Sequence, residues 1–155
     1  MSRGTVREIW IAPEMGAQME HRESVRARAG QGLEGDRYCG RGGSSAPDQH
    51  VTLIEAEQLE WFQQTTGIRF PAAWTRRNLI TRGISLNPLV GHHFRIGDVE
   101  IKGIRLCEPC GTLQRRTGLP ILPAMVGRAG LNGQILSDGE ISVGATLEIT
   151  KRQTD

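Results

Sequence analysis

The chain has 155 residues, of which 37% are hydrophobic and 23% charged, a composition that fits one globular domain with its own core. The 20 glycines follow no three-residue period and apolar residues occur along the whole length, which excludes collagen and disfavours intrinsic disorder. The formal net charge is only +2, so bulk charge gives no indication of nucleic acid as a partner. We therefore expect residues 1–155 to form a single domain.

The sequence pattern carries no membrane or export signal. No apolar run approaches the ~18 residues that span a bilayer. The opening residues, MSRGTVREIW, lack the apolar stretch of a signal peptide. A cytoplasmic protein without a membrane partner is therefore expected.

Short segments of alternating apolar and polar residues, separated by Gly, Pro and Asp, dominate the chain. They predict strands at residues 5–12, 24–29, 50–54, 78–81, 94–96, 99–106, 133–136 and 141–149. One amphipathic helix is predicted over residues 55–66, where Leu59 and Phe62 share a face. A shorter helix begins near Leu122 or Pro123. So many short strands indicate a mainly β fold, either a sandwich or a barrel.

Turn residues divide the C-terminal third. Gly97-Asp98 lies between two alternating segments and predicts a two-residue hairpin. Asp138-Gly139 predicts a second turn, so the C-terminal third is expected to be a meander. Residues 30–49 are rich in Gly, Ser, Asp and Pro, and loops of this length are usually functional or mobile.

The segment LCEPCG at residues 106–111 is the sharpest local feature. Its two cysteines suit half of a zinc site, a dithiol redox pair, or two core thiols. For Cys107, which continues the alternation of a strand, we favour the core thiol. Cys110 lies between a proline and a glycine at the strand exit, where a thiolate can face a cavity and ligate a transition metal. Cys39, in the Gly-rich loop, is interpreted as an incidental surface thiol.

Basic residues are almost all arginine, 17 against two lysines. Arginine binds carboxylates and phosphates through a planar fork, although a codon bias explains the same count. On the predicted strand, Arg76 and Asn78 share one face and Arg77 takes the other. They either bind an anion or face solvent. The glycines of residues 32–38 can let backbone amides approach a phosphate.

Taken in order, several stretches resemble the MOSC domain, which is named for the C-terminal part of molybdenum cofactor sulfurases. The matching stretches are GLEGDRY at 32–38, VTLIEAE at 51–57, RRNLITRGISLNPLVGHHFRIGDVEIKGIRLCEPC at 76–110 and ISVGATLEI at 141–149. The resemblance covers nearly the whole chain. It implies a mainly β, barrel-like fold with a few short helices. It also implies binding of the molybdenum cofactor, a pyranopterin phosphate whose dithiolene holds the metal.

The resemblance also assigns residues to the cofactor. Cys110, and not Cys107, matches the cysteine that ligates molybdenum in proteins similar to the mitochondrial amidoxime-reducing component. Arg76 and Asn78 match positions that hold the cofactor, and Arg37 matches an arginine that contacts its phosphate. Two further cofactor contacts are expected in the matching segments, at Asp36 and Thr52.

A candidate catalytic residue beside the metal is His50. It ends the segment Asp48-Gln49-His50, which falls, in a loose alignment, where the family places polar residues on the open side of molybdenum. A surface histidine, or one satisfied in the core, is the alternative.

The implied reaction is removal of oxygen from a small N-hydroxylated substrate at molybdenum. The protein supplies binding and orientation, and an external donor protein supplies the electrons. The chain resembles bacterial members that consist of this domain alone. Pyridoxal phosphate, which sulfurases carry in another domain, is not expected, because neither Lys102 nor Lys151 lies in a phosphate-binding context.

Two departures keep other functions open. Met15 stands where the amidoxime-reducing proteins have a lysine, and Glu108 stands where they have a serine. An enzyme is therefore one hypothesis. The others are a sulfur or cofactor carrier, in which Cys110 bears a persulfide, and a regulatory domain with a degenerate pocket.

Overall fold

The computed structural model describes residues 3–39, 46–108, 114–115, 118 and 124–151. Its strands are β1 (Arg3–Ile11), β2 (Glu20–Arg22), β3 (Ser24–Arg28), β4 (Gly32–Leu33), β5 (Val51–Glu55), β6 (Leu79–Arg82), β7 (His93–Ile96), β8 (Val99–Leu106), β9 (Leu131–Ile135), β10 (Gly139–Ser142) and β11 (Thr146–Lys151). Its helices include α1 (Ala56–Thr66) and the short 3-10 helices η1 (Pro47–Gln49), η2 (Ala72–Thr75) and η3 (Asn87–Leu89). The fold is mainly β, as the sequence predicts.

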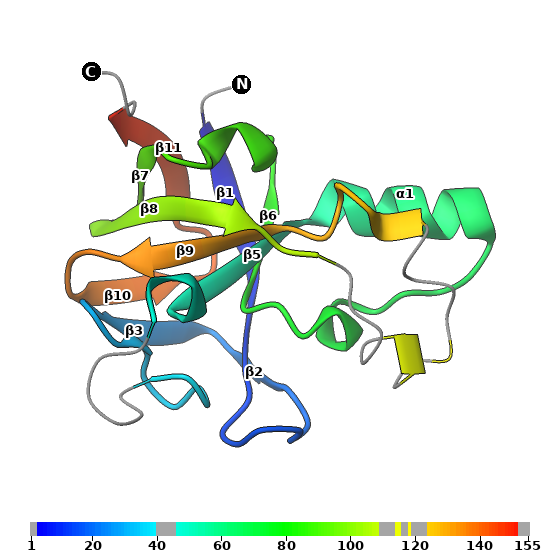
Figure 1. The fold of residues 1–155 in the computed structure, drawn as a ribbon, viewed down its shortest axis with the longest axis horizontal. Coiled ribbons are helices and arrows are strands. Elements are labelled where there is room, and N and C mark those ends of the chain that lie inside the picture. Colours follow the sequence, from blue (N-terminus) through cyan, green and yellow to red (C-terminus); the bar gives the residue numbers. More distant parts are fainter. Residues whose placement is uncertain (1–2, 40–45, 109–113, 116–117, 119–123, 152–155) are drawn as a thin grey trace.

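The strands close into a barrel (Figure 1). An eight-stranded sheet runs in the order β11-β7-β8-β9-β5-β6-β1-β2, and an additional pairing of β11 with β1 closes it. One edge of β1 is divided, because residues 3–5 pair with β11 and residues 9–11 pair with β2. With β2 outside the ring, seven of the eight strands form the barrel. A smaller sheet, β10-β3-β4, lies below β9 in this view.

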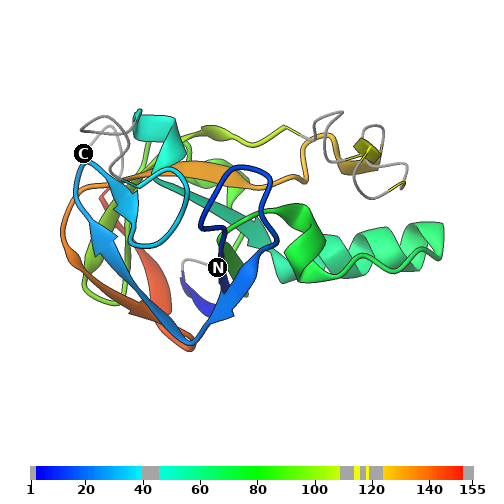
Figure 2. The ribbon, with the colours of Figure 1, turned by 90° about the horizontal axis from the view of Figure 1, so that it is seen from below.

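Two apolar cores hold these layers. Inside the barrel, alternate residues of the strands are buried, such as Val51 and Leu53 on β5. Outside the barrel, α1 covers β5 and β6, which pair in parallel through this helical crossover. The second core consists of Ile54, Leu59, Phe62, Phe70, Ile80 and Met125. Figure 2 shows α1 projecting from one side of the barrel, so part of the outer wall stays free for a site.

Most predicted elements are confirmed with small changes in their ends. The helix over 55–66 is α1, and it stops at Gly67, whose φ is 71°. The Gly97-Asp98 hairpin is confirmed by the pairing of Ile96 with Val99 and by a φ of 58° at Gly97. Helical backbone is present at residues 124–125, whereas the predicted start of that helix lies outside the described residues.

The predicted C-terminal meander is wrong beyond β9. β10 pairs with β3 rather than with β9, and β11 pairs with β7 and β1. The predicted strand over 141–149 is split, because Gly144 has a φ of 93° and turns the chain between β10 and β11. Alternation in the sequence continues through this turn, so it could not reveal the break.

No helix in the described ranges is long and apolar enough to cross a membrane. This agrees with the absence of a long apolar run in the sequence.

Candidate functional site

A cavity of about 350 Å³ lies against the outer wall of the barrel. Its walls come from the loop after β4, from η1, from the segments before β6 and after β8, and from the strands β5, β8 and β9. The residues that line it are Arg37, Tyr38, Asp48, Gln49, Thr52, Arg76, Arg77, Arg105, Cys107, Glu108 and Asn132. Polar and charged side chains therefore dominate the cavity.

A row of side chains across three strands forms its floor. Asn132 on β9 is directly opposite Thr52 on β5 and directly opposite Arg105 on β8. Directly opposite residues project from the same face of a sheet, about 5 Å apart. The inner neighbours of this row, such as Leu53 and Leu131, fill the barrel core. The row consequently faces outward, into the cavity.

A β-bulge brings Arg105 into this row. The register of β8 against β9 shifts between Gly103 and Arg105. Without the extra residue, strict alternation from the buried Ile101 would turn Arg105 toward the barrel interior. With it, Leu106 packs against the core instead, and Arg105 faces the cavity. Bulges commonly redirect a side chain in this way beside functional sites.

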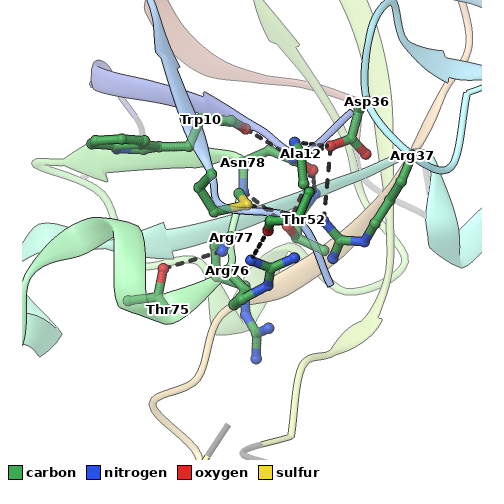
Figure 3. Close-up of polar contacts among 11 residues, drawn as sticks. Trp10, Ala12, Asp36, Arg37, Thr52, Thr75, Arg76, Arg77 and Asn78 are labelled. Atoms are coloured by element: carbon green, nitrogen blue, oxygen red, sulfur yellow. Dashed lines mark hydrogen bonds and ion pairs between the residues drawn. The ribbon is translucent and has the colours of Figure 1, made fainter. Parts of the chain in front are cut away.

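Asn78 joins three segments behind the cavity (Figure 3). Its Oδ1 accepts hydrogen bonds from the N–H of Thr52 at 3.0 Å and from the hydroxyl of Thr52 at 3.2 Å. Its Nδ2 donates to the carbonyl of Trp10 at 3.0 Å and to Asp36 Oδ1 at 3.4 Å. A side-chain amide has two donors and two acceptor sites, so protein groups occupy all four. Asn78 thus holds together the three segments that lie behind the cavity.

Asp36 holds the loop that carries Arg37. The buried Asp36 carboxylate accepts the N–H of Ala12 at 3.0 Å, and its Oδ1 lies 4.0 Å from Arg37 Nη1. The Arg37 guanidinium lies 4.7 Å from the centre of the Tyr38 ring. A guanidinium held by a carboxylate and an aromatic face keeps a defined position. Arg37 is therefore presented to the cavity in a fixed orientation.

Arg76 and Arg77 line the cavity together, which corrects the predicted alternation. β6 begins only at Leu79, and Arg76 ends η2 in the left-handed region with a φ of 61°. Strand alternation does not apply to such a backbone. Arg76 Nη1 donates to the carbonyl of Ala17, and Arg77 Nε donates to the carbonyl of Ala129 at 2.9 Å. Figure 3 shows both arginines beside Thr52.

The cavity is a cationic site. Four guanidinium groups line it, against the carboxylates of Asp48 and Glu108. Asp48 already pairs with Arg105, with Oδ2 and Nε 3.0 Å apart. Convergent arginines favour an anionic ligand, because charge-assisted hydrogen bonds are about twice as strong as neutral ones. The arrangement therefore suits a phosphate or another oxyanion.

The MOSC domain model matches residues 40–148. This chain belongs to the MOSC domain family. It is similar to the protein YflK of Bacillus subtilis, with 25% identity over 148 residues that cover 93% of this chain and 63% of the relative. The chain thus spans less than two thirds of that relative. The family is associated with molybdenum cofactor binding, and the matched range includes Arg76, Asn78 and Cys110 but not Asp36 and Arg37.

Solved structures share the MOSC fold. The YuaD protein of Bacillus subtilis superposes with a TM-score of 0.80 at 16% identity, covering 97% of each chain. YiiM of Geobacillus stearothermophilus gives a TM-score of 0.75 at 18% identity, covering 96% of this chain and 76% of its own. YiiM of Escherichia coli gives 0.72 at 20% identity, covering 96% and 70%. At these identities the likeness establishes the fold.

Cys107 is buried, as predicted for a core thiol, but it also lines the 350 Å³ cavity described above. Its Sγ lies 3.4 Å from Asn132 Oδ1 as a hydrogen-bond donor. Burial raises the pKa of the Cys107 thiol, and the nearby charges of Arg77 and Arg105 only partly oppose this rise. Cys107 is therefore a neutral thiol near neutral pH. Cys110, the predicted metal ligand, lies outside the described residues.

His50 is buried against the barrel and is not among the residues that line the cavity. Its Nδ1 accepts the N–H of Ile135 at 3.0 Å, so the proton of a neutral ring lies on Nε2. This contact is the one expected of a histidine satisfied in the core. Catalysis by His50 stays a prediction that this geometry does not favour.

Met15 and Cys39 lie at a second cavity of about 520 Å³. Arg37 and Asp36 line it as well, so Met15, where the resemblance to the amidoxime-reducing proteins implies a lysine, borders the same cavity as the predicted phosphate contact. Met15 is exposed there. Cys39 is half-buried, and burial raises the pKa of its thiol. It is thus less accessible than the predicted surface thiol.

Sequence reasoning missed two residues of the floor, Arg105 and Asn132. The missing signal for Arg105 is the bulge, which no local pattern in residues 99–106 marks. Asn132 was overlooked because the predicted strand began one residue later, at Gly133; a strand that starts at Leu131 would have placed Asn132 on the outer face. Within the described ranges, no three His, Cys, Asp or Glu side chains gather to form a metal site.

Proposed function

We propose that the arginine-lined cavity binds the molybdenum cofactor and that the protein reduces small N-hydroxylated compounds. One observation carries this proposal. Four guanidinium groups from three separate segments line one cavity, and Glu108, two residues before Cys110 in the sequence, lines it as well. The short distance along the sequence between Glu108 and Cys110 supports the proposal that one site holds both the anionic cofactor and its metal ligand.

The residues present fit such a cofactor. A pyranopterin carries a phosphate, and arginines bind phosphates through bidentate charge-assisted hydrogen bonds. The volume of about 350 Å³ lies within the range of roughly 300–1,000 Å³ typical of ligand pockets. Arg37 and Arg76 would hold the phosphate end, and Cys110 would ligate molybdenum.

The other predicted cofactor residues support the site indirectly. All four hydrogen-bonding positions of the Asn78 side chain are occupied by protein groups. Thr52 is held by Asn78, and Asp36 orients Arg37. In this proposal Asn78, Asp36 and Thr52 therefore position the groups that contact the ligand.

When bound, the cofactor supplies two-electron removal of oxygen from the substrate. The chain's own residues bind and orient the reactants and offset negative charge. Glu108 also lines the cavity, and its negative charge would oppose an anionic ligand. In this proposal the electrons come from a separate donor protein.

An amidoxime reductase assay tests this function. The wild-type protein, produced in a host that makes molybdenum cofactor, is supplied with benzamidoxime and a reduced viologen dye as artificial donor. Cys110→Ser should lose at least about 100-fold of the activity, since even outer-shell changes at metal sites cost about 10–100-fold. Cys107→Ser, the matched thiol control, should stay within about threefold.

Equal losses in the two variants would contradict the assignment and indicate a thiol pair or a shared zinc site. A persulfide on Cys110 in a protein that holds no molybdenum would instead assign the sulfur-carrier function.

A further inference from the structure

A buried side chain on the floor of the cavity presents a hydrogen-bond donor without a partner. Asn132 is only 6% exposed and lines the cavity. Its Oδ1 accepts the Cys107 thiol, which directs Nδ2 away from the sulfur. Within the described part of the chain, Nδ2 has no hydrogen-bond partner. Nδ2 is not among the described polar atoms that are shielded from solvent without a partner, so it is open to the cavity, where it can donate to a ligand acceptor.

Two guanidinium groups flank this donor. Arg105 lies directly opposite Asn132 across the strands, and it donates from Nε to Asp48 and from Nη1 to the carbonyl of Leu106. Arg77 donates from Nε to the carbonyl of Ala129 and from Nη2 to that of Glu108. Each guanidinium has five N–H donors, so three on each remain for an acceptor other than the described residues.

A neutral thiol lies between the two arginines. The thiol of Cys107 is neutral, because its burial raises its pKa, and both Arg77 and Arg105 exert a Coulomb effect on it. The two cations therefore flank the same point. Two anions among the described residues compete with a ligand there. Glu108 lines the cavity and also acts on the Cys107 thiol, and Asp48, whose side chain is 33% exposed, pairs with an Arg105 side chain that is 56% exposed. Exposed pairs of this kind are weak, so a ligand carboxylate can displace Asp48.

We propose that Arg77, Arg105 and Asn132 form an oxyanion subsite that binds a carboxylate of the substrate. The preferred substrates are then N-hydroxylated compounds that also carry a carboxylate. This inference rests on the proposed function for the identity of the reacting group. The subsite consists of residues of the protein alone, so its binding of a carboxylate can be tested without the cofactor and independently of the proposed function.

The binding test is a titration of the apoprotein with benzoate, followed by the amide NMR signals of Asn132 and Cys107. Arg105→Gln should weaken benzoate about tenfold, the factor that corresponds to losing one charge-assisted contact. Asp48→Asn should strengthen it about threefold by removing the competitor. Asn132→Ala should also weaken benzoate binding. If the Asn132→Ala variant folds poorly, Arg105→Gln still tests the subsite, because Arg105 is exposed and its replacement leaves the core intact.

Matched controls exclude a general charge effect. Arg95→Gln and Glu148→Gln remove the same charges from an ion pair that is not among the residues lining the cavity. Both should leave benzoate affinity within about twofold. Equal benzoate affinity in the wild type and Arg105→Gln would overturn the subsite.

A kinetic comparison on the molybdenum-loaded protein then identifies the occupant. In the wild type, para-carboxybenzamidoxime should show a KM at least about tenfold lower than benzamidoxime does, and Arg105→Gln should abolish this preference. If Arg105→Gln instead loses molybdenum, the subsite holds the cofactor's own phosphate and the substrate assignment is wrong. If benzoate binding depends on Arg105 as predicted, but the protein neither takes up molybdenum nor reduces amidoximes, the subsite is supported and the proposed function is refuted.

Discussion

At the scale of single residues, Asn78 joins three segments behind the site. It links the end of β1 through Trp10, the start of β5 through Thr52, and the arginine loop through Asp36. These segments are far apart in the sequence. One buried amide therefore ties the loop that carries Arg37 to the barrel wall.

Replacing Asn78 by Ala should destabilise the protein by about 2–4 kcal/mol, because it leaves several buried groups without partners at about 1–3 kcal/mol each. Urea unfolding measures this loss. Asn87→Ala is the control, since it removes an exposed contact to the carbonyl of Gly127 and should cost less than about 1 kcal/mol. Similar losses in both variants would contradict the role of Asn78.

The Cys107 thiol should resist alkylation near neutral pH in the folded protein. Its buried position raises its pKa, so the reactive thiolate is scarce, and the rate should rise only as the pH increases above the ordinary thiol range. Mass spectrometry of iodoacetamide-treated protein, with and without urea, measures the protection. Rapid labelling of Cys107 in the folded state would show that the thiol is exposed to the cavity as a thiolate.

The sequence could predict that residues of the matching motifs share a site, including Thr52 on the floor of the cavity, but it could not predict the other two floor residues. Arg37, Arg76 and Asn78 stand in segments that resemble a known family, and the structure brings all three to one site. Arg105 was unpredictable, because its direction depends on a bulge that only the pairing of β8 with β9 defines. The position of Arg77 likewise depends on the left-handed conformation of Arg76.

At the scale of elements, two glycines permit the close packing that shapes the wall. Gly130 has a φ of 107°, and a Cβ there would collide with the carbonyl of Leu53 on β5. At Gly103 a Cβ would collide with the carbonyl of Leu89. The connection into β9 and the bulged half of β8 therefore require glycine.

Gly130→Ala should cost about 3 kcal/mol or more, because backbone strain and a backbone collision combine. Gly144→Ala is the matched control: its φ of 93° imposes strain, but no atom lies within 4 Å of the added Cβ. It should cost about 1–2 kcal/mol. Thermal unfolding compares the two, and equal losses would mean that the collision at Leu53 relaxes.

Local turn chemistry predicted some connections and not others. The Gly97-Asp98 hairpin follows directly from a two-residue turn between alternating segments, and the structure confirms it. The partner of β10 does not follow from local sequence, because Ile141 pairs with Val25, more than a hundred residues away. Non-local pairing of this kind depends on the whole core.

At the scale of the whole molecule, the barrel closes where the chain's two ends meet. Arg3 on β1 pairs in register with Glu148 on β11, and Glu148 also bonds to Arg95 on β7. The sequence indicated a barrel through its short strands and its family resemblance. The order of strands around the ring could not be read from it, since closure joins residues at opposite ends of the chain.

The closing contact should make stability depend on acid. Hydrogen bonds from Arg3 and Arg95, with their charges, hold the pKa of Glu148 below its ordinary value of 4.5. A lowered pKa contributes stability above the ordinary value, and this contribution is lost as the pH falls through the folded-state pKa. Glu148→Gln should therefore flatten the decline in unfolding midpoint below that pH. An unchanged pH profile would show that the exposed pair contributes nothing.

The position of the site follows from how the two cores share the outer wall. On β5, Ile54 faces the apolar cluster under α1, while Thr52 two residues earlier faces the cavity. The cavity thus borders a rigid barrel on one side and the helical layer on the other. A cofactor bound there would be held mainly by the barrel strands and the loops attached to them.

The most direct test of the central claim is elemental analysis of the purified protein for molybdenum and zinc. Wild type, Cys110→Ser and Arg95→Gln are produced in a host that makes molybdenum cofactor. We predict close to one molybdenum per chain in the wild type and in Arg95→Gln, and a large loss in Cys110→Ser. Zinc without molybdenum, or neither metal in the wild type, would contradict cofactor binding in the arginine-lined cavity.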